Sequence, residues 1–311
     1  MQCLTQGFPT AWAGSYRAAS PKVLMSIGSW ELRGSLVCDL HHSAYPNGTD
    51  NATDWEGVAQ MKLFMTCMQC LTETGRPSFE LIVADYYDDG VAYATCSAGH
   101  TTAQLVQSPK FEILLEAGAI ALLEGFTLEA VADFSAALER FYEFAVRVGC
   151  VARSLSPELY ASMFKEMSKQ SERQLGAFML LYAIEFGEAY KPNTKMGEFR
   201  NSAIHKGRIP PVEEATRYAA YVYETILSLY RRLRDKHSDH MMAVVVRDLG
   251  ERRMKVPPGI QVATNSTTFF FTDAQADSPP EFSKALEAFK EARQMIAGAI
   301  PQMQALHDQL I

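Results

Sequence analysis

The hydrophobic period of this chain changes at Pro109, and this change constrains the fold more than any other feature. Beyond Pro109, apolar residues recur every three or four positions, which is the spacing of one face of an α-helix. Gly, Ser-Pro and Pro-Pro breaks divide this pattern into separate helices. The expected helices cover residues 111–125, 127–145, 156–169, 171–190, 196–206, 212–236 and 280–297. Residues 109–311 are therefore predicted to form a helical domain.

The chain before Pro109 has the period of two that is typical of strands. Strands are expected at residues 61–66, 79–87, 91–95 and 101–107. Residues 1–60 are rich in Gly, Pro, Ser and Asn and are predicted to be an irregular extension. The expected fold class is α+β, a mainly α-helical bundle preceded by a small β domain at residues 61–108.

Residues 241–275 break the helical pattern. Two short β-like runs, 241–246 and 267–271, flank a Pro-Pro-Gly turn and predict a β-hairpin insertion in the helical domain. Basic residues lie before and within this segment, at Arg231, Arg232, Arg234 and Lys236 and at Arg247, Arg252, Arg253 and Lys255. They indicate either a local RNA contact or solvated side chains at a helix end.

Four potential metal ligands occur in two pairs. Cys67 and Cys70 form C-x2-C, and Cys96 and His100 form C-x3-H about 25 residues further on. Two such pairs on turns at strand ends suit a tetrahedral Zn²⁺, and Gly99 can supply the positive φ of the second turn. The alternatives are buried free cysteines beside a surface histidine, or a redox C-x2-C. This segment resembles a zinc ribbon over about 45 residues. Because four protein ligands leave no open position, we expect a structural zinc and not a zinc-dependent enzyme.

The composition sets limits on location and on partners. The chain has 311 residues, of which 48% are hydrophobic and 21% charged, as in a folded protein. It has no long apolar stretch for a membrane span and no signal-peptide pattern near the start, so we expect a cytoplasmic protein. The net charge of −7 argues against nucleic-acid binding by bulk charge, but it allows a local basic site.

The run EFRNSAIHKGRIPP contains the residues with the clearest chemical potential, Arg200, Asn201 and His205. Arginine pairs with phosphate oxygens through two N–H groups and stays charged. Histidine can accept and release a proton near neutral pH. The alternative is structural, with His205 near the helix C-terminus before Gly207 and Arg200 as a surface charge.

In this motif a polar residue follows the Arg directly, and the His lies five positions after the Arg. This pattern resembles the signature of HEPN-domain ribonucleases. The run from Leu138 to Phe144 and the exit from His205 to Pro210 are also similar to that family, so the resemblance covers about 130 residues, from 111 to 236. Some members controlled by nucleotidylation carry a Tyr two residues after the His. Gly207 stands there, so this control is not expected.

The resemblance implies a metal-independent endoribonuclease that cleaves RNA through its own 2′-hydroxyl. His205 would move the proton, Arg200 would stabilise the phosphorane, and Asn201 would orient one of the reacting groups. It also implies a homodimer, and a toxin or phage-defence effector with an antitoxin or regulatory protein as partner. The alternative is a non-catalytic HEPN-type protein that serves in dimerisation or in binding RNA or another partner.

Overall fold

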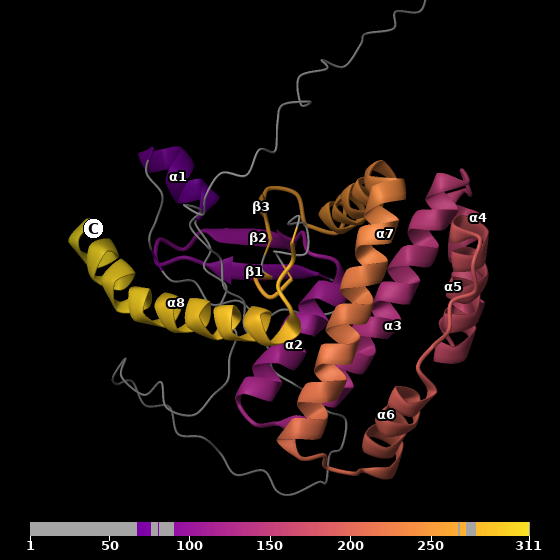
Figure 1. Cartoon of the computed structure of the whole chain (residues 1–311). Helices are drawn as coiled ribbons and strands as arrows, with labels where there is room; N and C mark the ends of the chain where they lie inside the picture. The colour runs from indigo at the N-terminus through magenta and orange to yellow at the C-terminus, as the bar shows by residue number, and fades with distance from the viewer. Residues whose placement is uncertain (1–66, 76–79, 81–89, 267, 272–277, 311) are drawn as a thin grey trace, which may run out of the picture.

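The computed structural model describes residues 67–75, 80, 90–266, 268–271 and 278–310 (Figure 1). The extension predicted for residues 1–60 and the strand predicted for 61–66 lie outside these residues. So does the strand predicted for 79–87, except for Glu80. The described chain is mainly helical with a small three-stranded sheet, which confirms the α+β class.

Helix α3 (Thr127–Ala152) is the centre of the helical part. It packs against α2 (Lys110–Leu123), α5 (Ser171–Phe186), α6 (Thr194–Lys206) and α7 (Val212–Arg253). In Figure 1, α3 lies between α7 and the neighbouring helices α4 (Pro157–Met167) and α5. The last helix, α8 (Phe282–Leu310), packs against α7. Among the described helices, none combines the length and hydrophobicity needed to cross a membrane.

The core of the bundle is aromatic. Phe111, Phe134, Phe141 and Tyr223 are at most 1% exposed, so the helical pattern of the sequence corresponds to real burial. The rings of Phe111 and Phe141 meet edge to face at a centroid distance of 5.2 Å, which is a favourable aromatic geometry. The predicted helices are confirmed. Four have ends within a few residues of the prediction, whereas α3, α7 and α8 continue well beyond the predicted ends at 145, 236 and 297.

The hairpin predicted for residues 241–275 is wrong, because residues 241–246 continue α7 to Arg253. The helix is kinked at His237 (φ −138°, ψ 29°), next to the predicted end at residue 236. Leu233, His237, Met241 and Val244 are all buried. Their spacing of three and four residues is helical, so burial against the bundle overrides the β propensity of the valine run.

The strands form one sheet in the order β1-β2-β3. Strands β1 (Val91–Thr95) and β2 (Thr101–Val106) are antiparallel, as predicted, with Val91 opposite Leu105. Strand β3 (Gln261–Asn265) runs parallel to β2, with Gln261 opposite Thr102. The only strand within residues 241–275 that is described therefore joins the N-terminal sheet.

Residues 268–271, at the end of the predicted run 267–271, are not a strand. The carboxylate of Glu116 in α2 accepts hydrogen bonds from the backbone N–H groups of Phe269 (2.5 Å) and Phe270 (3.1 Å). The rings of Phe270 and Phe271 are buried beside Tyr223. Because the amide donors are satisfied by a side chain, the segment needs no strand partner.

A substitution at Gly118 of α2 tests how tightly the core is packed. A Cβ built at this position would lie 2.8 Å from Cδ2 of Phe134, a fully buried ring. Gly118→Ala should therefore lower the free energy of unfolding by about 1–3 kcal/mol, although alanine favours helices. Gly176→Ala in α5, with no heavy atom within 4 Å of the new Cβ, should instead raise it by about 0.5–1 kcal/mol. Urea unfolding checks both signs, and two stabilised variants would contradict the tight α2–α3 contact.

Glu116 should make stability depend on pH. Burial raises the pKa of this carboxyl to about 7, although the N–H groups of Phe269 and Phe270 act in the opposite direction. A raised pKa means that the folded state holds the proton more tightly, so this contribution to stability is complete below about pH 4.5 and is lost as the pH rises through about 7. Glu116→Gln cannot ionise. Wild type should therefore lose stability between pH 5 and pH 8, whereas the variant should not lose this contribution. The free energy of unfolding of the variant minus that of wild type should be about 1–3 kcal/mol larger at pH 8 than at pH 5. Equal differences at the two pH values would contradict this.

Candidate active site and metal centre

Helix α6 carries all three residues of the predicted catalytic motif. It begins after Asn193, whose Oδ1 accepts a hydrogen bond from the backbone N–H of Met196 at 3.2 Å. It ends at Gly207, which has the left-handed conformation (φ 65°) that favours glycine. Both ends of this short helix are thus fixed by local sequence.

The packing of α6 leaves the motif at the edge of the bundle. Ala203 is buried, and the ring of Phe199 lies 5.4 Å from that of Tyr218 in α7. These two positions lie four residues apart, so they form the helix face that meets the bundle. Asn201 and His205 are exposed. A polymer in solution can therefore reach them.

The structure brings Arg200, Asn201 and His205 together. Nη1 of Arg200 lies 3.1 Å from Oδ1 of Asn201 and 3.2 Å from Nε2 of His205. A guanidinium N–H can only donate, so Nε2 of His205 must carry its lone pair and the ring proton must be on Nδ1. In this arrangement the lone pair of Nε2 accepts the hydrogen bond of Arg200, so Nε2 can act as a base once a substrate hydroxyl takes the place of that N–H donor.

Sequence reasoning missed the fourth member of this group, Glu139 of α3. Its Oε1 accepts a hydrogen bond from Nη2 of Arg200 at 2.7 Å. The two side chains are 29% and 23% exposed, so this ion pair is largely shielded from water. Glu139 lies 61 residues before Arg200, and no spacing rule joins positions so far apart. The sequence signal was a glutamate between apolar residues of a helix that the family resemblance had already marked.

Tyr218 of α7 lies beneath the motif, but it is not a proton carrier. Its hydroxyl is 2.8 Å from Oγ of Ser135 in α3, and Ser135 Oγ donates to the carbonyl oxygen of Val131 at 2.6 Å. Tyr218 is therefore the donor in the first hydrogen bond. Burial raises the pKa of Tyr218 to about 12, so it stays protonated at neutral pH. Its role is to connect α3, α6 and α7.

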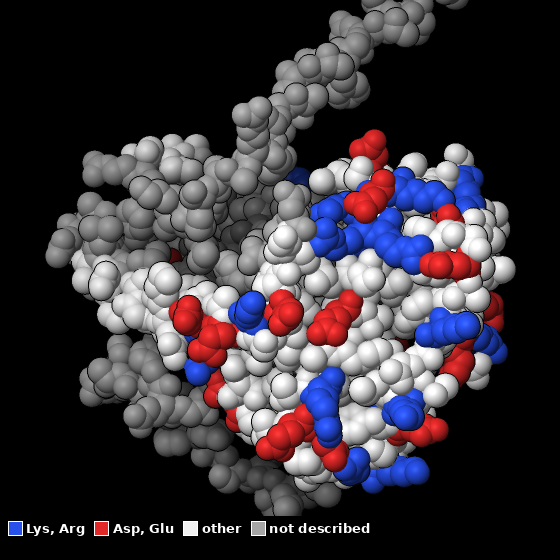
Figure 2. Space-filling view, viewed as in Figure 1, with Lys and Arg blue, Asp and Glu red and all other residues white. Residues whose placement is uncertain are grey.

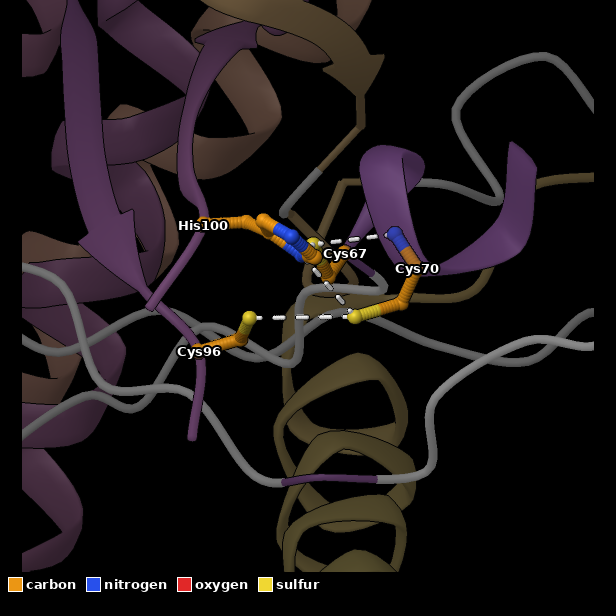
Figure 3. A group of neighbouring side chains, drawn as sticks. All are labelled: Cys67, Cys70, Cys96 and His100. Atoms are coloured by element: carbon orange, nitrogen blue, oxygen red, sulfur yellow. Dashed lines mark hydrogen bonds between the residues drawn. The ribbon is translucent and has the colours of Figure 1, made fainter. Parts of the chain in front are cut away.

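The four predicted metal ligands also lie together, as Figure 3 shows. The ligand atoms of Cys67, Cys70, Cys96 and His100 all lie within 4.8 Å of one another. Sγ of Cys70 is 3.8 Å from Sγ of Cys96 and 3.3 Å from Nδ1 of His100, and Sγ of Cys67 is 3.9 Å from the same nitrogen. This group could hold a metal ion.

Two of the distances between these ligand atoms have the size expected in a tetrahedral site, and Cys67 lies somewhat further from His100. Metal–sulfur bonds of about 2.3 Å at tetrahedral angles place two sulfur atoms roughly 3.8 Å apart, and a sulfur and a nitrogen slightly closer. The separations of Cys70 Sγ from Cys96 Sγ, 3.8 Å, and from His100 Nδ1, 3.3 Å, are of this size. The donor set of three sulfurs and one imidazole nitrogen suits a soft or borderline cation.

Surrounding groups hold these ligands in place. Nε2 of His100 lies 3.5 Å from Oε2 of Glu73, so Nδ1 is left to face the sulfur atoms. Sγ of Cys67 accepts hydrogen bonds from the N–H of Cys70 (3.5 Å) and the hydroxyl of Thr102 (3.7 Å). Burial acts to raise the pKa of Cys67, but these donors outweigh it and lower the pKa to about 7. Burial and the two neighbouring cysteines raise the pKa of Cys70 to about 12.

The two ligand pairs lie on different kinds of structure. Cys96 and His100 flank the predicted turn between β1 and β2, where Gly99 has a φ of 83° and donates to the carbonyl oxygen of Cys96 at 2.9 Å. Cys67 and Cys70 lie at the start of helix α1 (Met68–Thr74), so the tight turn expected for this pair is wrong. The strand end expected before it, at 61–66, lies outside the described residues. Since Cys67 is the N-cap residue, its sulfur is directed at the first amides of the helix.

The basic residues near the end of the predicted helix 212–236 are engaged within the protein. Lys236 pairs with Glu185 at 2.9 Å, and Arg232 pairs with Glu188 and lies over the ring of Phe186 at 4.4 Å. They do not mark a helix end, because α7 continues to Arg253. Figure 2 shows Lys and Arg side chains gathered over the upper part of α7 with acidic side chains among them. Lys and Arg side chains predominate on this part of the surface, although Arg232 and Lys236 are paired with glutamates.

Comparisons of the chain with known proteins give no relative. No family model matches it, and neither a curated protein nor a solved structure matches it.

Proposed function

We propose that this protein is a metal-independent endoribonuclease of the HEPN type, with its active site at the C-terminal turn of α6. The observation that carries this proposal is the 3.2 Å contact between Nη1 of Arg200 and Nε2 of His205. It places a permanent cation beside the unprotonated ring nitrogen of a histidine, on an exposed turn. A phosphodiester bound there would meet the charge and the base at once.

The reaction would use the 2′-hydroxyl of the substrate as the nucleophile. A bond forms between O2′ and phosphorus, the bond from phosphorus to O5′ breaks, and the products are a 2′,3′-cyclic phosphate and a 5′-hydroxyl. Nε2 of His205 takes the proton from O2′, a step worth about 10²–10⁴ in rate. Arg200 stabilises the negative charge on the phosphorane, and Asn201 orients the guanidinium. DNA lacks the 2′-hydroxyl and is not cleaved.

The leaving O5′ also needs a proton. One histidine cannot hold the proton from O2′ and give another to O5′ at the same moment. We therefore include in the proposal a homodimer in which two His205-bearing turns face one another, as the HEPN resemblance implies. The same resemblance suggests a toxin or phage-defence effector that a partner protein restrains.

The nuclease proposal is tested with single-stranded RNA in excess EDTA. Wild type should cleave it over short times and leave cyclic phosphate ends. His205→Ala and Arg200→Ala should each lower the rate by about 100-fold or more. Lys195→Ala, an exposed cation on the same helix, is the control and should keep full activity. Circular dichroism and thermal melting should show all variants folded.

Two results would remove the proposal. One is an absolute requirement for added Mg²⁺, and the other is cleavage of a substrate with 2′-deoxyribose at every position. If His205→Ala keeps full activity, His205 is not the proton carrier, but the rest of the nuclease proposal stands.

A second candidate function is favoured by the ion pair of Arg200 with Glu139. This pair at 2.7 Å already neutralises the cation, as it would in a non-catalytic protein that uses the helices for dimerisation or for binding RNA. This alternative would be supported if the wild-type protein is folded and binds RNA or a partner but does not cleave RNA.

We also propose that the cluster of Cys67, Cys70, Cys96 and His100 binds a structural Zn²⁺. The supporting observations are the tetrahedral separations and the second contact of His100 with Glu73. Four protein ligands leave no position for a reacting water, so the ion would serve the fold. It would join α1 to the turn between β1 and β2, a part of the chain with a small core of its own.

Metal analysis should find about one zinc per chain in wild type and well below half in Cys70→Ser. The melting temperature of Cys70→Ser should fall, because metal binding contributes several kcal/mol to folding in small metal sites. Cys150→Ser is the matched control, since Cys150 is also a free thiol but lies in α3 outside the cluster. Zinc-free wild type, or equal zinc content and stability in the two variants, would refute the site.

A further inference from the structure

Glu139 lies on a face of α3 that is directed at the candidate active site. Ser135, one helical turn before it, contacts the hydroxyl of Tyr218 at 2.8 Å. Glu139 itself contacts Nη2 of Arg200 at 2.7 Å. Residues four apart share a helix face, so α3 holds α7 through Ser135 and α6 through Glu139.

The two helices differ in how firmly they are held. Helix α3 is the central helix, with Phe134, Ala137 and Phe141 completely buried around Glu139. Helix α6 lies at the edge, and among its residues only Ala203 is buried. A carboxylate on the buried helix is therefore a fixed reference point for a long and otherwise mobile arginine on the edge helix.

We propose that Glu139 is a positioning residue for the Arg200–His205 pair, an inference that rests on the proposed nuclease function. The guanidinium is a rigid planar fork, so fixing Nη2 also fixes the direction of Nη1. With Nη2 held by Glu139, Nη1 lies between Oδ1 of Asn201 and Nε2 of His205. Glu139 thus acts on His205 through Arg200 and selects the tautomer whose Nε2 carries no proton.

This arrangement leaves room for the substrate. The contacts of Arg200 with Glu139, Asn201 and His205 use only part of its N–H donors, so the remaining donors are free to bind phosphate oxygens. Glu139 does not have to leave when RNA binds. Its negative charge would repel a phosphate bound at Arg200, so we expect that removal of Glu139 does not raise KM even though it releases the arginine.

The chain provides a closely matched control in Glu143, one turn further along α3. Glu143 pairs with Arg140 at 2.5 Å, and the two side chains are 26% and 25% exposed. The pair of Glu139 and Arg200 has nearly the same exposure, at 29% and 23%. Glu143→Ala therefore removes an equivalent ion pair from the same helix without touching Arg200.

The test measures RNA cleavage and the tautomer of His205 in Glu139→Ala, Glu139→Gln and Glu143→Ala. In Glu139→Ala we expect kcat to fall by roughly 10- to 100-fold with no rise in KM. Glu139→Gln, which keeps an oxygen acceptor for Nη2, should fall less, and Glu143→Ala should match wild type. In nitrogen-15 NMR spectra, neutral His205 should be protonated at Nδ1 in wild type and at Nε2, as in a free histidine side chain, in Glu139→Ala.

Each outcome has a definite meaning. Equal kcat in Glu139→Ala and Glu143→Ala, with an unchanged His205 tautomer, overturns the positioning role and leaves the nuclease proposal intact. A loss seen only in stability, or only as a higher KM, also overturns it. If wild type cleaves no RNA, the nuclease proposal fails, while the NMR comparison still shows whether Glu139 orients Arg200 toward His205. If Glu139→Ala does not fold, the Gln variant decides by the same readouts.

Discussion

Helix α3 packs against α2, α5, α6 and α7, and this burial determines where every candidate active-site residue lies. Its apolar positions fill the core, so its polar side chains are fixed in direction. Glu139 is the most consequential of them, because it meets Arg200 at 2.7 Å on an edge helix that has little core of its own. The chemistry proposed for α6 therefore depends on a residue of the central helix, and stability and geometry of the site are coupled through one ion pair.

A second set of contacts joins the metal cluster to the bundle. Thr102 pairs with Gln261 across β2 and β3 and also donates to Sγ of Cys67, so the same residue serves the sheet and a metal ligand. Beyond β3, Glu116 and Ser108 hold residues 268–270 against α2. The four clustered residues are thus connected to the helical core through β2 and β3, so a metal ion bound by them would stabilise more of the chain than its own ligands.

Local patterns in the sequence predicted much of this structure, and distant contacts were not predictable from them. Helical spacing located α6, and the three motif residues meet because all lie on one helix. The C-x2-C and C-x3-H spacings predicted four ligands that the structure does bring together. Glu139 lies too far away in sequence for any such rule. The valine run of residues 241–246 misled, because its β propensity was weaker than the burial of Met241 and Val244 at helical spacing.

In the proposed mechanism, a scissile phosphate binds at Arg200 with its neighbouring 2′-oxygen at His205. The most direct test is an experimental structure with an RNA oligonucleotide made uncleavable by 2′-O-methyl groups. The account predicts a phosphate oxygen in hydrogen-bond contact with Arg200, Glu139 still on Nη2, and a 2′-oxygen roughly 2.6–3.2 Å from Nε2 of His205. RNA bound elsewhere, with Arg200 and His205 still in contact with each other and with no RNA atom near them, would contradict this mechanism.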